Sequence, residues 1–270
     1  IMVLPEIAPG IDTALMTRLS FVTVAIWWLV FTLPILLRVK EPPRRIEAHE
    51  QGFSPLKASF SRLYQTFKEI RKYRDLSMGL LAFWVYANGI GTIIVMATAY
   101  GNELGFGQTT LIGTLLMVQF LAAPFAILFG WLSKKIGTKK SIYLSLSIYT
   151  AIAIAGYFLY HEWQFWVLGA AVATVQGGSQ ALSRSFIGKM MPKSKSAEFY
   201  GFFSVFEKFA SILGPAIFGV VSTIMGESRL SIASLIVFFA VGMILLKNVN
   251  LERGIAVAQQ DEQEMVAVGE

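Results

Sequence analysis

The chain has 270 residues, of which 55% are hydrophobic and 15% are charged, and its formal net charge is +6. Soluble domains approach one quarter charged residues, so this composition, with a mean hydropathy of +0.59, excludes a soluble globular protein and indicates a polytopic protein of the lipid bilayer. The absence of cysteine excludes disulfides, thiol catalysis and cysteine-based metal sites. The chain begins at Ile1 with no basic stretch before its first apolar run, so we expect no signal peptide and interpret the sequence as a fragment.

Seven apolar runs are long enough to cross a bilayer, since about 20 helical residues span a hydrocarbon core of ~30 Å. They do not alternate with a period of two, so they predict helices and an all-α membrane bundle. The predicted spans are 16–37, 76–99, 109–132, 141–160, 164–188, 197–225 and 229–247.

Basic residues alternate between the successive connections of these spans. The segment 38–75, the connection 134–140 and the stretch 184–195 are rich in Lys and Arg. The connections at 100–108 and around His161 carry none. This alternation follows the positive-inside rule and predicts an external N-terminus and a cytoplasmic C-terminus. The positive net charge is therefore interpreted as a topology signal, with no nucleic-acid partner.

The polar segments complete the predicted organisation. Residues 56–75 place apolar and basic side chains at helical spacing, which predicts an amphipathic helix near anionic lipid, or alternatively a solvated face over another helix. The acidic C-terminal tail is expected to be poorly ordered. The expected parts are an external segment 1–15, a span 16–37, a cytoplasmic linker 38–75, a six-helix bundle 76–247 and a cytoplasmic tail 248–270.

Two adjacent ionisable residues, Glu207 and Lys208, lie near the middle of the sixth predicted span. They are about 15 Å from its polar start, close to the bilayer midplane, where a charge costs at least ~2.5 kcal/mol. Three interpretations stay open: a solute or proton site in a water-filled pore, a polar clamp between helices, or snorkelling to the interface. Because neighbours point about 100° apart, the two residues are poor partners for each other, and we expect Glu207 to pair with Arg184 of the fifth span.

Other intramembrane polar residues follow helical spacing. Gln176, Gln180 and Arg184 fall at i, i+4 and i+8, and Ser179 lies on a neighbouring stripe. In each case a functional site competes with a simpler role: a hydrogen bond between helices for Asn88 and Gln119, and snorkelling for Arg184. The pair Gly177–Gly178 predicts either a close approach of another helix or a loosened helix. The sequence has two histidines and no nucleotide-binding motif, so we expect no enzyme, metal or cofactor, and a gradient as the driving force.

The connection between the third and fourth spans, GWLSKKIGTKK at 130–140, resembles the cytoplasmic loop motif of the major facilitator superfamily. Longer stretches at 63–76, 92–106, 175–185 and 197–215 resemble the vacuole-effluxer-like branch of that superfamily. Two positions depart from the pattern, since Lys134 stands where the loop motif has aspartate and Asn88 where the branch has an acid. The resemblance implies the C-terminal half of a transporter of about twelve spans, whose N-terminal half is a missing partner.

These observations and the resemblance predict a secondary active transporter of small polar solutes that works by alternating access in a bacterial inner membrane. The resemblance implies amino acid efflux as a candidate activity, and proton coupling is a further candidate. The second, third, fifth and sixth spans are expected to line its cavity. A non-transporting membrane scaffold or receptor is the alternative. The candidate solute and coupling residues are Asn88, Gln119, Gln176, Ser179, Gln180, Glu207 and Lys208. The candidate cytoplasmic gate consists of Gly130, Lys134, Lys135, Gly137, Lys139, Lys140 and Arg184.

Overall fold

The computed structural model describes residues 12–39, 64, 68 and 70–269, and the chain divides into two units between Ser54 and Pro55. The predicted linker at 40–55 and most of the predicted amphipathic helix at 56–75 lie outside the described residues, as does most of the external segment.

The first unit contributes one long helix, α2 (Thr13–Arg38). Asp12 caps its first turn, because the carboxylate accepts a hydrogen bond from the Ala14 amide at 3.0 Å. Large apolar side chains such as Trp27 and Trp28 are 62% and 71% exposed within the unit. A helix that is apolar around its whole circumference requires lipid or other protein as its surroundings.

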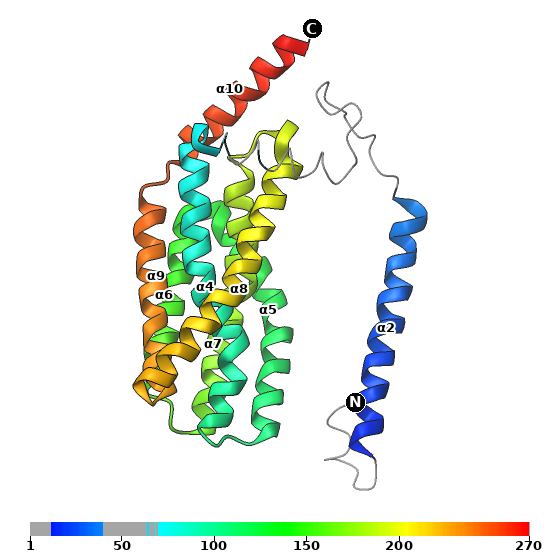
Figure 1. The fold of residues 1–270 in the computed structure, drawn as a ribbon, viewed down its shortest axis with the longest axis vertical. Helices are drawn as coiled ribbons and strands as arrows, with labels where there is room; N and C mark the ends of the chain where they lie inside the picture. Colours follow the sequence, from blue (N-terminus) through cyan, green and yellow to red (C-terminus); the bar gives the residue numbers. More distant parts are fainter. Residues whose placement is uncertain (1–11, 40–63, 65–67, 69, 270) are drawn as a thin grey trace. The chain divides into compact units, whose positions relative to one another are not determined.

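The second unit is a helix bundle (Figure 1). Its helices agree with the six predicted runs after residue 75, and no strand occurs among the described residues. The elements are η2 (Ile70–Lys72), α4 (Arg74–Glu103), α5 (Gln108–Ile136), α6 (Thr138–Tyr157), α7 (Glu162–Gly188), η3 (Lys193–Lys195), α8 (Ser196–Met225), α9 (Ser228–Lys247) and α10 (Leu251–Gly269).

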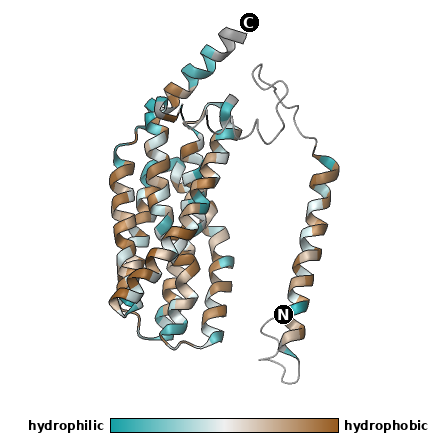
Figure 2. Cartoon of the chain, viewed as in Figure 1, coloured by the Kyte–Doolittle hydropathy of each residue, from teal (hydrophilic) through white to brown (hydrophobic). Residues whose placement is uncertain are grey.

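Five described helices are long and apolar enough to cross a membrane, namely α2, α4, α5, α8 and α9. The helices α6 and α7 carry more polar residues, and their membrane crossing remains a prediction. Figure 2 shows hydrophobic residues along the length of the bundle helices and hydrophilic ones concentrated in α10. Outward-facing side chains such as Phe120 (79% exposed) and Ile127 (77%) suit a lipid environment.

Aromatic side chains fill the centre of the bundle. Phe83 of α4 stacks on Phe203 of α8 with ring centroids 4.3 Å apart, and Tyr149 of α6 stacks on Phe239 of α9 at 5.6 Å. These rings are 5% exposed or less and belong to one hydrophobic core cluster shared by the four helices.

Small residues bring α5 and α7 together. A Cβ atom placed on Gly178 would lie 2.4 Å from the Cβ of Phe129, and one on Gly177 would lie 3.0 Å from the carbonyl oxygen of Ala122. The helix α7 continues unbroken through both glycines. Of the two predicted uses of this pair, the structure therefore shows close helix packing.

The structure of the C-terminal tail differs from the sequence-based expectation. It was expected to be poorly ordered, but Leu251–Gly269 forms the helix α10. Gly254 and Ala258 face inward, and a Cβ atom on Gly254 would lie 2.7 Å from the sulfur of Met190. An inward-facing stripe thus anchors a helix whose overall composition is polar.

Candidate functional site

A groove of about 160 Å³ lies between α4, α7 and α8, and we call it the polar groove. Three of the predicted site residues line it: Ser179, Gln180 and Glu207. Its other lining residues are Phe83, Tyr86, Ala87, Ile90, Gly91, Ser183, Ala210 and Ser211. The groove therefore combines an apolar wall from α4 with hydroxyl, amide and carboxylate groups from α7 and α8.

Hydroxyl groups connect the floor of the groove. The hydroxyl of Ser183 donates to the carbonyl oxygen of Ser179 at 2.6 Å, and the hydroxyl of Ser179 donates to the carbonyl oxygen of Gln176 at 3.1 Å. Tyr86 of α4 donates to the Ser183 hydroxyl oxygen at 2.7 Å. Because these groups are buried and satisfied, they fix the position of α4 against α7 beneath the groove.

The rim of the groove holds an ion pair between Arg184 of α7 and Glu207 of α8. The Nη2 atom of Arg184 lies 2.8 and 2.9 Å from the two carboxylate oxygens, which confirms the predicted pairing. The guanidinium group also lies over the ring of Phe203, 5.9 Å from its centroid. The side chains are 55% and 34% exposed, so the pair borders open space and is not sealed in the core.

Asn88 occupies a different place from the polar groove. It is 2% exposed, and its amide nitrogen donates to the carbonyl oxygen of Trp84 at 2.7 Å. A Cβ atom on Gly214 would lie 2.4 Å from the Asn88 carbonyl oxygen, so α8 covers this part of α4. Asn88 Oδ1 and Trp84 Nε1 are both buried without a hydrogen-bond partner among the described residues.

The remaining predicted solute residues are spread around the groove. Gln119 of α5 and Gln176 of α7 line a separate, mainly apolar cavity. Lys208 is exposed and forms no ion pair with any residue that the structure describes. The structure thus groups Ser179, Gln180, Arg184 and Glu207 but does not bring Asn88, Gln119 or Lys208 to them.

Apart from Arg184 of α7, the predicted gate residues lie where α5 ends and α6 begins. The ammonium group of Lys139 donates to the carbonyl oxygens of Lys247 and Val249 at 3.0 and 2.7 Å. It therefore satisfies free carbonyls at the C-terminal end of α9, where a helix attracts positive charge. The ammonium group of Lys135 lies 3.8 Å from the ring centroid of Trp131.

The other gate residues have simpler surroundings. Gly137 has a φ of +91°, which allows the sharp turn between α5 and α6. Gly130 has no neighbour within 4 Å of an added Cβ atom, so packing does not require glycine there. Lys134 and Lys140 are exposed.

Sequence reasoning did not find an ionic cluster at the start of α4. Asp75 is 4% exposed, and its two oxygens lie 2.8 and 2.5 Å from Nη2 and Nε of Arg253. It also accepts a hydrogen bond from the Asn250 amide at 2.8 Å. The paired carboxylate holds the pKa of the Arg253 guanidinium above its usual value.

A second buried carboxylate, Asp261 of α10, completes this cluster. It is 5% exposed, accepts a hydrogen bond from the Tyr73 hydroxyl at 2.6 Å, and pairs with Lys72. Burial alone would raise the pKa of Asp261, but these two hydrogen bonds and the positive charge of Lys195 hold it below its usual value. The available signal was the small and apolar stripe at 251, 254 and 258, which predicts a packed helix face.

The fold and the groove define an integral membrane helix bundle with a polar site between three of its helices. No three His, Asp or Glu side chains come together as metal ligands in the part of the chain that the structure describes. The sequence matches the family described as vacuole effluxer Atg22 like over residues 2–259. The chain therefore belongs to this family.

Individual relatives agree with this assignment. The chain is 41% identical to the MFS-type transporter YxiO of Bacillus subtilis (strain 168), over 90% of its own length and 56% of the relative's. It is 28% identical to autophagy-related protein 22-1 of Aspergillus niger, over 90% of the chain and 43% of the relative. It is 27% identical to autophagy-related protein 22 of Yarrowia lipolytica, over 88% and 45%. The chain spans about half the length of the curated relatives it matches.

Proposed function

We propose that the chain forms the C-terminal six-helix half, with one preceding span, of a facilitator-type secondary transporter that moves small polar solutes by alternating access. Amino acids released across a bacterial inner membrane are the solutes that we propose. The ion pair between Arg184 and Glu207 at the rim of the polar groove is the observation that carries this proposal.

The cost of placing charges among apolar helices supports a functional role for the pair. Glu207 lies about 16 Å along α8 from Ser196, so it is far from both ends of the helix. Charged side chains at such depth are expensive and face a water-filled space or a partner. Here both conditions are met, because the two residues pair and remain partly exposed.

The chemistry of the groove suits a zwitterion. Arg184 offers hydrogen-bond donors that match a carboxylate, and Glu207 offers acceptors that match an ammonium group. A bound amino acid would replace the internal ion pair with two others, one between its carboxylate and Arg184 and one between its ammonium group and Glu207. Gln180 of the groove is available for further hydrogen bonds. Glu207 is also the proposed site for proton coupling, since protonation would release Arg184 for a solute carboxylate.

Alternating access requires a second half that closes the exposed side of the groove. The relatives, about twice as long as this chain, are consistent with such a partner. Following the positive-inside rule, we place the lysines at 134–140 and both ends of α10 on the cytoplasmic side. The bonds from Lys139 to the end of α9 would then belong to the cytoplasmic gate.

Flux measurements in proteoliposomes, on the chain together with the proposed second half, test the proposal. A mixture of radiolabelled amino acids is loaded, and counterflow is compared for the wild type, Glu207→Gln and Glu252→Gln. Glu252 is an exposed carboxylate of α10 outside the groove, so its variant controls for the loss of one charge. We expect Glu207→Gln to lower flux at least about tenfold, as for loss of a charge-assisted interaction of ~1.5–3 kcal/mol. Equal flux in all three proteins would remove Glu207 from the mechanism, and no flux in any would favour a scaffold or receptor.

A further inference from the structure

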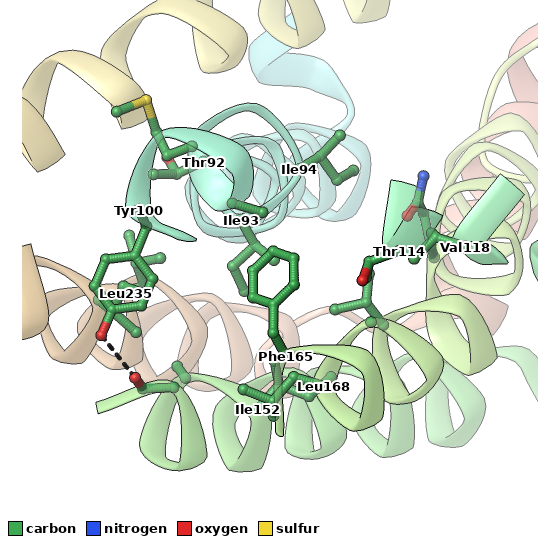
Figure 3. Close-up of a pocket in the computed structure, with 18 of the residues that line it drawn as sticks. Thr92, Ile93, Ile94, Tyr100, Thr114, Val118, Ile152, Phe165, Leu168 and Leu235 are labelled. Carbon is green, nitrogen blue, oxygen red and sulfur yellow. Dashed lines mark hydrogen bonds between the residues drawn. The ribbon is translucent and has the colours of Figure 1, made fainter. Parts of the chain in front are cut away.

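A second cavity, about 130 Å³ in volume, lies among α4, α5, α6, α7, α8 and α9 (Figure 3). It shares no lining residue with the polar groove. Ile93 and Phe165 lie near the centre of the view, with Tyr100 on one side and Thr114 on the other. We call this space the apolar cavity.

The wall of the apolar cavity excludes charged ligands. Aliphatic and aromatic side chains such as Ile93, Leu168 and Leu235 form most of it, and none of the described lining residues carries a charge. A site lined in this way favours apolar ligands, since a cavity of about 150 Å³ lined by similar residues binds benzene. Its ligand should therefore be neutral and largely apolar.

A buried hydroxyl group interrupts the apolar wall. Thr114 is 3% exposed, and its hydroxyl oxygen has no hydrogen-bond partner among the described residues. Threonines in helices usually bond back to a carbonyl one turn earlier, as Thr92 does to Asn88 at 2.6 Å and Thr150 does to Leu146 at 2.8 Å. The hydroxyl of Thr114 makes no such bond. A buried hydroxyl without a partner is unfavourable, so this one is available to a ligand.

The packing of Thr114 explains why its hydroxyl stays free. A Cβ atom placed on Gly169 of α7 would lie 2.3 Å from the Cγ2 methyl group of Thr114. The methyl group therefore fills the contact between α5 and α7, which leaves the hydroxyl oxygen as the remaining branch of the side chain.

The cavity also has an accessible edge. Leu115 and Gln119 of α5 line it, and both side chains are exposed. Gln176 of α7 lines it as well. A molecule can thus enter past a glutamine-bearing edge and place its apolar part against Phe165 and Ile93.

We propose that the apolar cavity binds a small neutral amphiphile, with an apolar body of about six carbon atoms and one hydroxyl or carbonyl group that hydrogen-bonds Thr114. The site differs from the polar groove in lining, charge and ligand class. The proposed binding site is independent of the proposed transport function. Ligand binding to it can be measured without measuring flux.

Photolabelling of the protein in lipid nanodiscs tests this proposal. The probe is a hexanol that carries a diazirine, and its adducts are located by peptide mass spectrometry. We expect saturable labelling of α4, α5 and α7 residues that line the cavity, with competition by unlabelled hexanol. Thr114→Val removes the hydroxyl at nearly constant shape and should weaken binding about 2- to 10-fold, as for one neutral hydrogen bond. Ala97→Phe should abolish cavity labelling, because Ala97 lines the cavity and the larger ring occupies it.

Ala151→Phe is the matched control, since Ala151 is exposed on α6 and does not line the cavity. Labelling in this control should equal that of the wild type. Adducts confined to outward-facing residues such as Phe120 and Ile127, without saturation, would overturn the proposal. Thr114→Val that binds the probe as tightly as the wild type would also overturn the proposal. If Ala97→Phe does not fold, Thr114→Val alone provides the test.

Discussion

Tyr86 of α4 donates a hydrogen bond to Ser183 of α7, with 2.7 Å between the two hydroxyl oxygens, beneath the Arg184–Glu207 pair. Both side chains are buried, at 2% and 1% exposure, so water cannot replace the bond if it is removed. The hydrogen bond therefore connects α4, which forms the apolar wall of the polar groove, to α7 at its floor.

We expect Tyr86→Phe to destabilise the protein by about 1 kcal/mol, the typical net contribution of one hydrogen bond. Thermal unfolding in nanodiscs measures the change. Tyr160→Phe is the control, because Tyr160 is 61% exposed and its ring still lies under Arg229 after the exchange. In a double-mutant cycle, Ser183→Ala should lose most of its effect in the Tyr86→Phe background. Additive effects would show that the bond contributes nothing.

Removing one member of the Arg184–Glu207 pair should differ from removing both. Arg184→Ala leaves the partly exposed carboxylate of Glu207 without its partner, so we expect a loss of about 1 kcal/mol. The double variant with Glu207→Ala should regain most of this stability, because no charge is left unpaired. Thermal unfolding gives the stabilities, and counterflow gives the activity.

The two measurements separate a structural clamp from a transport site. If the pair only joins α7 to α8, the double variant should recover both stability and flux. Under the proposed function it recovers stability alone. A double variant with full flux would therefore contradict the role of the pair in transport while leaving the packing argument intact.

The glycines of α7 and α8 provide a packing test. Gly178→Ala would place a Cβ atom 2.4 Å from the Cβ of Phe129, and such overpacking costs about 1–3 kcal/mol. Gly219 of α8 has no atom within 4 Å of an added Cβ, so Gly219→Ala should stabilise the helix by about 0.5–1 kcal/mol. Unfolding temperatures that move in opposite directions are the expected result. A neutral Gly178→Ala would mean that α5 and α7 are farther apart than described.

The sequence predicted the helices and one long-range contact for simple physical reasons. Apolar length alone identifies a span, so the seven runs could be located without knowledge of packing. The pairing of Arg184 with Glu207 was also predictable, because two charges at depth on successive spans each need a partner, and the structure confirms it.

The face that each polar residue occupies was harder to predict. Helical spacing groups Asn88, Gly91 and Thr92, yet Gly91 lines the polar groove whereas α8 covers Asn88 and Thr92. Spacing shows which residues share a stripe, but the neighbour that covers the stripe depends on tertiary packing. The third span was expected to line the solute cavity, but this span, α5, lines the apolar cavity and not the polar groove. Helical spacing could not predict this difference either.

The tail was wrongly predicted to be poorly ordered because its acidic composition gave no sign that Asp261 is buried. Asp261 counted toward an acidic, solvated segment, but it is enclosed by Lys72 and Tyr73, with Lys195 acting through its charge. These groups hold the pKa of Asp261 below its usual value of 3.8. A carboxylate with a lowered pKa stabilises the docked helix at pH values above its ordinary pKa, and this contribution is lost as the pH falls through the lowered value.

We therefore expect α10 to stay docked at pH 7 and to detach progressively below about pH 4, as Asp261 becomes protonated. Because the chain contains no cysteine, a single Gln259→Cys substitution on the exposed side of α10 accepts one spin label. The spectrum should report an immobilised label at neutral pH and a mobile one in acid. Asp261→Asn should already raise the mobility at pH 7, whereas the matched change Glu252→Gln should not. A label that stays immobilised in Asp261→Asn at pH 7 would show that the contacts of Asp261 are not needed to hold α10 against α4.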